Sequence, residues 1–186
     1  MKLKRYESYD QYVKSQEDTD RKKGPRPALH YIEVSDNASW LRRRGHVSYG
    51  MCHGARAGQE VDWFRDEFPG AKIWGTDLFP KGHLSVCKWD FSRPRRKWVG
   101  KFDFVYSNAL DHAMDPVATL KCWFNQLKPD GFLLIQWSRY HIRSLCGDCF
   151  GAHFHEYIAM LNSIGKVVDV NFHYRTTVTI VSRRRG

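Results

Sequence analysis

The segment GMCHGARAGQE (50–60) decides which fold the chain can adopt. It follows the short apolar run HVSY (46–49) and precedes Val61, Phe64 and Phe68, whose spacing is typical of a helix with one apolar face. Glycine permits positive φ and lets a ligand approach the main chain. The free N–H groups at a helix start attract a carboxylate or phosphate. The segment therefore predicts a strand, a ligand-binding turn and a helix, in that order.

Strand and helix patterns continue to alternate along the chain. Apolar runs predict a first strand at 46–49 and six more at 71–77, 84–90, 101–108, 132–138, 167–174 and 176–182. Between them, Asp115 and Pro116 are typical of a helix start. This alternation predicts an α/β fold with a doubly wound, mainly parallel, seven-stranded sheet and helices on both faces. The short junction before the last run predicts an antiparallel last strand.

Residues 1–28 are predicted to form an N-terminal helix and linker, and residues 29–186 a single domain. Tyr6, Tyr9 and Tyr12 recur at helical spacing, so one side of this helix is expected to dock on the core. No apolar run has the roughly 18 residues that a membrane span needs, and the charged N-terminus lacks the apolar segment of a secretory signal. A cytoplasmic protein without membrane contact is expected.

The chain carries a formal net charge of +10, and basic residues cluster at 42–44, 93–97 and 183–185. This balance favours a polyanionic partner or an acidic substrate. The same clusters also fit solvated loops and a terminal tail. Nucleic acid therefore stays open as an alternative partner.

Cys146 and Cys149 have C-x-x-C spacing, and His153 and His155 follow closely. Zinc sites usually place a longer insertion between the cysteine pair and the histidine pair, and separate the histidines by about three to five residues. The five cysteines are scattered along the chain, which is typical of reduced thiols. No metal site is expected.

Several landmarks, in order, resemble the class I S-adenosylmethionine-dependent methyltransferases. The stretch GMCHG, with Gly50, Cys52 and Gly54, resembles the G-x-G-x-G motif of their first strand. KFDFVYSNALDH (101–112) resembles their fourth strand and its following loop, and LKPDGFLLI (127–135) resembles their LKPGG turn into the fifth strand. The resemblance covers residues 45–182 and implies S-adenosyl-L-methionine as cofactor. GARAGQE and SNALDH also resemble a small bacterial and phage, type-11-like branch.

The resemblance implies roles for residues at the ends of the predicted strands. Asp77 would accept hydrogen bonds from the ribose diol, and Leu78 or Phe79 would pack on the adenine. Asp90 would accept from the adenine amino group, with a backbone N–H from Phe91 nearby. The methionine end would lie against residues of the glycine segment and of the loop after the fourth strand: Gly50, Cys52, His53, Gly54, Ala55 and Asn108.

Asp111 and His112 follow the fourth predicted strand and are the candidates for a catalytic base, which an acceptor needs if it must lose a proton early. Their alternative role is to cap the helix that starts near Asp115. The segment after the fifth strand is polar and rich in aromatic residues and histidine. It would form part of the acceptor pocket, or else a plain connecting loop. Its candidate substrate contacts are Tyr140, His141, Phe150 and His153.

The function that the resemblance implies is methyl transfer to an oxygen or nitrogen atom of a small molecule or glycan. A nucleic-acid methyltransferase is the first alternative, because of the charge, although SNAL occupies the place of an NPPY-type motif. A non-catalytic binding protein is the second, because Ser48 stands where an acidic residue is common and Cys52 replaces the middle glycine. A nucleotide-dependent dehydrogenase is disfavoured, since the spacing is not G-x-G-x-x-G.

Overall fold

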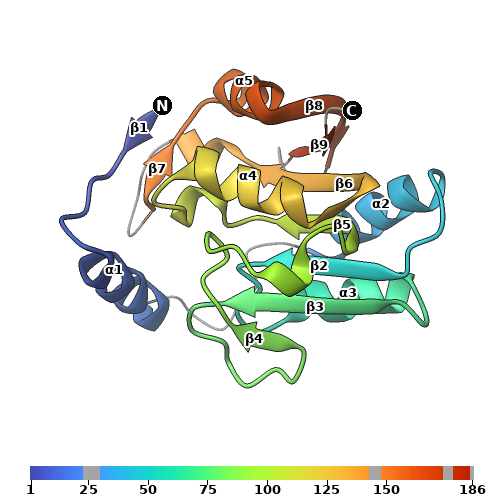
Figure 1. The fold of residues 1–186 in the computed structure, drawn as a ribbon, viewed down its shortest axis with the longest axis horizontal. Helices are drawn as coiled ribbons and strands as arrows, with labels where there is room; N and C mark the ends of the chain where they lie inside the picture. The colour runs from blue at the N-terminus through green and yellow to red at the C-terminus, as the bar shows by residue number, and fades with distance from the viewer. Residues whose placement is uncertain (23–29, 143–147, 174–177, 185–186) are drawn as a thin grey trace.

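The computed structural model describes residues 1–22, 30–142, 148–173 and 178–184 (Figure 1). The predicted linker beyond residue 22, Cys146 and the junction between the last two predicted strands lie outside these ranges. Within them, strands and helices alternate as the sequence predicts, and a central sheet lies between two layers of helices.

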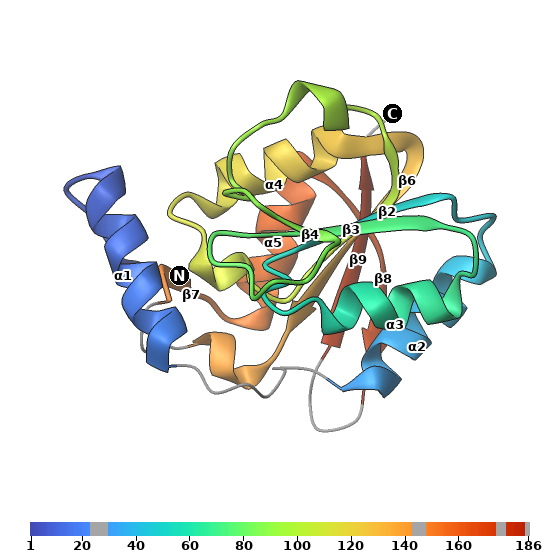
Figure 2. The same cartoon turned by 90° about the horizontal axis from the view of Figure 1, so that it is seen from below.

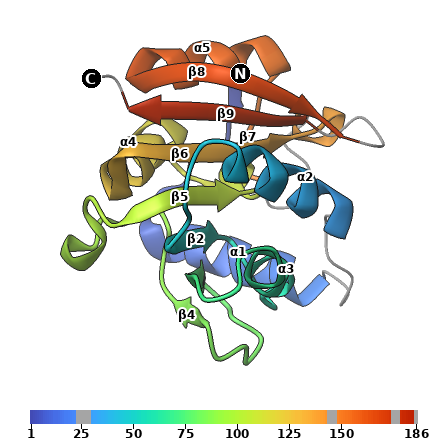
Figure 3. The same ribbon diagram turned by 90° about the vertical axis from the view of Figure 1, so that its right-hand side faces the viewer.

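Seven strands form the sheet, in the order β4-β3-β2-β5-β6-β9-β8. They are β2 (Tyr49–His53), β3 (Lys72–Asp77), β4 (Val86–Lys88), β5 (Phe102–Ser107), β6 (Leu127–Trp137), β8 (Gly165–Phe172) and β9 (Val178–Arg184). The strands from β4 to β6 in this order are parallel, and β9 is antiparallel to both β6 and β8. Figure 3 shows the sheet from β8 at the top to β4 at the bottom. The predicted mainly parallel sheet with an antiparallel last strand is confirmed.

Helices cover both faces of the sheet, with α2 and α3 on one face and α4 and α5 on the other (Figure 2). Their bounds are α2 (Tyr31–Arg42), α3 (Gln59–Glu67), α4 (Pro116–Gln126) and α5 (Phe154–Ile164). Val34 and Phe64 belong to the apolar core on the first face, and Leu120 and Leu161 to the core on the second. All four side chains are fully buried, and each contributes about 1.5–3 kcal/mol of hydrophobic stabilisation.

Helix α4 begins where the sequence predicts. Asp115 Oδ1 accepts a hydrogen bond from the Ala118 backbone N–H at 2.9 Å, and Pro116 is the first helical residue. A cap of this kind stabilises a helix by about 1 kcal/mol. Asp111 and His112 do not cap this helix, because they form a separate 3-10 turn, η2 (Leu110–His112).

Strand β2 extends further along the glycine segment than the predicted strand at 46–49. Gly50 and Cys52 lie inside the strand, and the turn begins only at Gly54, which has a φ of 76°. A Cβ atom at position 50 would lie 2.5 Å from the Phe104 ring. Gly50 is therefore needed for close packing between the strand and this ring, rather than for a turn.

The N-terminal segment is attached at the side of the sheet where the parallel strands end (Figure 1). β1 (Lys2–Leu3) pairs with β7 (Phe150–Gly151) in an antiparallel register, and α1 (Tyr9–Lys22) follows. Tyr12 is 2% exposed, so one side of the helix docks on the core as predicted.

Two further 3-10 turns are η1 (Arg96–Trp98) and η3 (Arg139–Ile142). The division into segments at residue 28 stays a prediction.

None of the helices in the described ranges is both long and apolar enough to cross a membrane.

Candidate functional site

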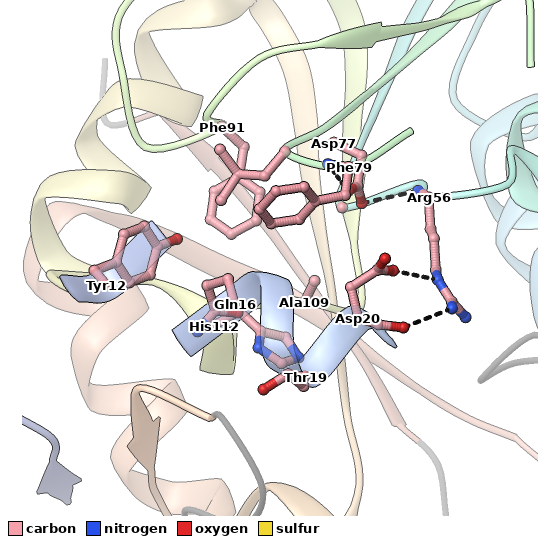
Figure 4. Close-up of a pocket in the computed structure, with 12 residues that line it drawn as sticks. Tyr12, Gln16, Thr19, Asp20, Arg56, Asp77, Phe79, Phe91, Ala109 and His112 are labelled. Carbon is pink, nitrogen blue, oxygen red and sulfur yellow. Dashed lines mark hydrogen bonds and ion pairs between the residues drawn. The ribbon is translucent and has the colours of Figure 1, made fainter. Parts of the chain in front are cut away.

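A cavity that is partly open to solvent lies at the carboxyl ends of β2, β3 and β5. Helix α1 forms one of its walls, and the turn after β2 and the loops after β3 and β5 form the others (Figure 4). Ligands of doubly wound sheets bind at this edge.

The turn after β2 brings the main chain close to the loop after β5. Gly54 donates its N–H to the Thr76 carbonyl at 2.8 Å, and its φ of 76° suits glycine. A Cβ atom at this position would lie 2.5 Å from the Cβ atom of Ala109. Gly54 and Ala109 both line the cavity, so the missing side chain lets the turn and the loop after β5 pack closely at the cavity wall.

Asp77, the last residue of β3, lies in the cavity with a fixed carboxylate. Its Oδ2 accepts from the Arg56 backbone N–H at 2.9 Å, and its Oδ1 accepts from the Phe79 backbone N–H at 2.7 Å (Figure 4). The two backbone bonds therefore hold the group in place at the cavity wall.

Helix α1 is held over the cavity by an ion pair. Asp20 accepts from Arg56 Nε at 2.8 Å and also pairs with Lys81, and the Asp20 side chain is 14% exposed. Burial by itself would raise the pKa of Asp20, but the hydrogen bonds from Lys81 and Arg56 lower it overall. The pair joins α1 to the turn after β2 (Figure 4).

Asp90 forms a second attachment of α1, and it does not line the cavity. Its Oδ2 accepts from the Tyr9 hydroxyl at 2.9 Å, and its Oδ1 accepts from the Ser92 backbone N–H at 2.8 Å. Its predicted partner Phe91 does line the cavity, as does Leu78. Direct contact between the Asp90 carboxylate and adenine stays a prediction, because Asp90 is not among the cavity-lining residues.

His53 is a core residue in this structure and does not line the cavity. It is fully buried, its Nδ1 lies 2.8 Å from Thr76 Oγ1, and its Nε2 lies 2.9 Å from Gln126 Oε1. Burial lowers its pKa to about 4, so the ring is neutral near pH 7 and stacks on Trp123.

Three other members of the predicted methionine-binding set are also packed below the surface. Gly50 lies under the Phe104 ring, and Cys52 and Ala55 belong to the core on the α2 and α3 side. Burial raises the pKa of the Cys52 thiol well above its usual value. Asn108 is half-buried beside Ala109 and is not among the cavity-lining residues. Gly54 is therefore the residue of this set that the structure brings to the cavity.

The two candidate bases take different positions. His112 lines the cavity, and its Nε2 lies 3.9 Å from Asp148 Oδ1. Asp111 lies behind it and is 7% exposed, and its Oδ2 lies 3.8 Å from His141 Nε2. Both residues therefore belong to one polar group beside the loop after β5.

The other predicted substrate contacts do not gather at the cavity. Tyr140 is 68% exposed, whereas Phe150 is fully buried and stacks on Tyr157 in the core. Phe150 is a core residue rather than a surface contact, because β7 pairs with β1 at this point. The exposed His153 precedes α5, and its backbone N–H donates to Glu156 at 2.8 Å. His141 of the predicted set forms an ion pair with Asp111, one of the candidate bases.

Sequence reasoning missed the cavity wall that α1 provides. The tyrosine spacing predicts a docked helix, but nothing in it indicates which part of the core the helix covers. The missed cavity residues are Tyr12, Gln16, Thr19 and Asp20 of α1.

Glu60 provides a test of the local electrostatics. It lies in the first turn of α3, is 5% exposed, and has a pKa raised to about 8 by burial and by the charge of Asp77. The pKa of Glu60 in the folded state is above the unfolded value of 4.5. The stability that the protonated Glu60 side chain contributes is therefore fully present below pH 4.5, and it is lost as the pH rises towards 8 and the buried carboxyl group must ionise. Glu60→Gln is expected to stabilise the fold by about 3 kcal/mol at pH 7 and by almost nothing at pH 4.

Urea unfolding of both proteins between pH 4 and pH 8 measures this difference. Asp66→Asn, which changes an exposed acid of the same helix, serves as the matched control. A Glu60→Gln effect that stays constant with pH would show that this carboxyl group is not buried as described.

No protein-family model matches the chain, and no curated protein matches its sequence. Solved structures do resemble it. An S-adenosylmethionine-dependent methyltransferase from Clostridium acetobutylicum ATCC 824 has a TM-score of 0.69 and 11% identity, over 96% of this chain and 99% of that chain. The N-methyltransferase NodS from Bradyrhizobium japonicum WM9, solved with S-adenosyl-L-homocysteine, has a TM-score of 0.66 and 16% identity, over 94% and 98%.

A third similar structure is the 1,6-didemethyltoxoflavin-N1-methyltransferase of Burkholderia thailandensis, with a TM-score of 0.66 and 15% identity over 82% of this chain and 79% of that chain. It was solved with 1,6-didemethyltoxoflavin and S-adenosylhomocysteine. The fold of this chain is thus the Rossmann-like fold of the class I S-adenosylmethionine-dependent methyltransferases.

Proposed function

We propose that the chain binds S-adenosyl-L-methionine in the cavity and transfers its methyl group to an oxygen or nitrogen atom of a small molecule or glycan. The observation that carries this proposal is the pairing of two features across one cavity. One is the main chain at Gly54, which lines the cavity, and the other is the fixed carboxylate of Asp77. The folds of methyltransferases solved with S-adenosylhomocysteine support the same cofactor.

Each part of the cofactor has a matching surface in the cavity. The ribose diol would donate to Asp77, and the adenine would lie against the apolar side chains of Leu78, Phe79 and Phe91. Aromatic and apolar walls with a few fixed polar groups are typical of cofactor sites. The methionine end would then lie against Gly54 and extend towards the loop after β5.

The protein's main contribution to methyl transfer is positioning. The cofactor already carries its leaving group, so the enzyme must hold acceptor and methyl group in line and exclude water. Helix α1 covers the cavity through the Asp20–Arg56 and Tyr9–Asp90 contacts. These contacts would be the means of shielding the bound cofactor from solvent.

His112 is the cavity residue best placed to act on the acceptor. It lies beside Ala109 on the cavity wall, with Asp111 next to it in η2. For a hydroxyl acceptor, the imidazole would take the proton as the methyl group arrives, and a positioned base of this kind contributes about 100-fold or more to the rate. Asp111 would act from behind the ring, as the second of the two candidate bases.

His112→Ala is expected to lower the rate of methyl transfer at least about 100-fold and to change S-adenosylhomocysteine affinity less than threefold. The assay follows tritium from labelled S-adenosylmethionine into separate small-molecule, glycan and RNA fractions of a cell extract. His46→Ala removes an exposed histidine at the opposite end of β2 and is the control.

Label in the small-molecule or glycan fraction supports the proposal. Label in RNA alone would assign the chain to the nucleic-acid alternative that its charge keeps open. Cofactor binding without transfer to any fraction would favour the non-catalytic alternative, and an unchanged rate for His112→Ala would remove this residue from the mechanism.

A further inference from the structure

Three side chains able to bind a metal ion meet beside the cavity: Asp111, His112 and Asp148. One ligand atom from each lies within 4.8 Å of the others. An ion between them would be at most about 2.8 Å from each atom, so side-chain shifts of less than about 1 Å would give metal–ligand distances of about 2.1 Å. The arrangement is close to a coordination geometry.

Asp111 lacks the partners that a buried carboxylate needs. It is 7% exposed, and its buried Oδ1 receives no hydrogen bond from the residues that the structure describes. Its ion-pair partner among these residues is His141, whose Nε2 lies 3.8 Å from Oδ2. Removing a carboxylate from water is costly unless the group is paired or binds a metal. A cation between the three side chains would supply the missing charge.

His141 supports Asp111 without being a ligand itself. The Ser138 backbone N–H donates to His141 Nδ1 at 2.9 Å, so the neutral ring carries its proton on Nε2. This nitrogen faces Asp111 Oδ2. A ring N–H beside a carboxylate is the kind of outer contact that orients metal ligands.

Hydrogen bonds to the backbone hold the three metal-binding side chains near one another before any ion binds. The Cys149 N–H donates to the Asp111 carbonyl at 2.7 Å, and the Cys149 thiol donates to the His112 carbonyl at 2.9 Å. Cys149 directly follows Asp148 along the chain. The segment that contributes Asp148 is therefore fixed against the turn that contributes the other two ligands, as a preorganised site requires.

We propose that Asp111, His112 and Asp148 form a binding site for a divalent transition-metal cation such as Mn²⁺. Two carboxylates and one imidazole suit such an ion, and three protein ligands leave coordination positions for water or for an oxygen atom of a bound molecule. Because His112 lines the cavity, the ion would lie at its wall, and with the ion bound His112 would act as a ligand and not as the base. This group differs from the cysteine–histidine pattern for which the sequence predicts no metal.

The test is a titration of untagged, full-length protein with Mn²⁺ and without cofactor, so that it is independent of the proposed methyl transfer. The loss of the electron paramagnetic resonance signal of free Mn²⁺ measures binding. Wild-type protein is expected to bind about one ion per chain saturably. Asp148→Asn and Asp111→Asn are expected to weaken binding at least about 10-fold.

Asp62→Asn is the matched control, because Asp62 lies 3.0 Å from His83 Nε2 in an exposed pair and should leave Mn²⁺ binding unchanged. Asp111→Asn removes a buried charge, so without metal its melting temperature should equal or exceed that of the wild type. The Mn²⁺-induced rise in melting temperature should nevertheless be lost. Absence of saturable binding to the wild type, or equal binding by wild type, Asp111→Asn and Asp148→Asn, would overturn the proposal.

Discussion

Asp77→Ala is expected to weaken the binding of S-adenosylhomocysteine at least about 100-fold, because hydrogen bonds to a charged group contribute about 1.5–3 kcal/mol each. The ribose diol would lose both of its acceptors at once. Isothermal titration calorimetry with purified protein measures the change. Circular dichroism and the melting temperature show whether the variant is folded, since Asp77 also accepts the Arg56 and Phe79 backbone N–H groups.

Asp130→Ala is the control for this experiment. Asp130 is an exposed acid near the start of β6 and does not line the cavity. Its removal lowers the negative charge of the protein by the same amount and should leave the affinity unchanged. A folded Asp77→Ala protein that binds S-adenosylhomocysteine as tightly as the wild type would show that the ribose lies elsewhere.

Gly54→Ala is expected to destabilise the protein by about 3 kcal/mol and to lower the melting temperature by about 6–12 °C. Two effects add. An L-residue is strained at a φ of 76°, and the new methyl group would lie 2.5 Å from the Cβ atom of Ala109. The turn must move to relieve this contact, so S-adenosylhomocysteine affinity should also fall at least about 10-fold.

Gly70→Ala is the control that separates backbone strain at positive φ from the steric contact that Gly54→Ala makes with Ala109. Gly70 has a similar φ of 88°, and a Cβ atom there would meet nothing within 4 Å. This control should lose about 1 kcal/mol, or about 2–4 °C, through backbone strain alone, and should bind cofactor normally. Equal melting temperatures for the two variants would contradict the close approach of Gly54 to Ala109.

The sheet was predictable because its strands are apolar runs of ordinary length between clear breaks. The order of the helices and the Asp115 cap followed from local sequence as well. Helix α2 was missed, although His30 and Glu33 form a capping box at its start and Val34, Ala38 and Leu41 make a buried stripe. The glutamate three residues after a possible cap was the available signal.

The candidate site was predictable where one residue's position along a strand decides its role. Asp77 ends a parallel strand, and the ends of such strands meet at one edge, so its place at the cavity follows from topology. Gly50, Cys52 and His53 were harder to place. A strand that begins three residues later than the predicted one moves all three from the turn into the sheet, where packing determines their surroundings.

The remaining parts of the site depend on contacts between distant segments. Asp20 meets Arg56 across the cavity, Tyr9 meets Asp90, and Asp148 meets His112. No local period or spacing encodes such pairs. Hydrophobic patterns predict the helices and strands and the faces that they bury, whereas these polar contacts depend on how the helices and strands pack against one another.

The most direct test of the account is calorimetric titration of the wild-type protein with S-adenosylhomocysteine, with NAD⁺ as a competitor. We predict saturable binding of about one molecule per chain, unaffected by NAD⁺ and competed by S-adenosylmethionine. Absence of binding up to about 1 mM, or displacement by NAD⁺, would contradict the claim that the cavity between α1 and the sheet edge holds an adenosyl sulfonium cofactor.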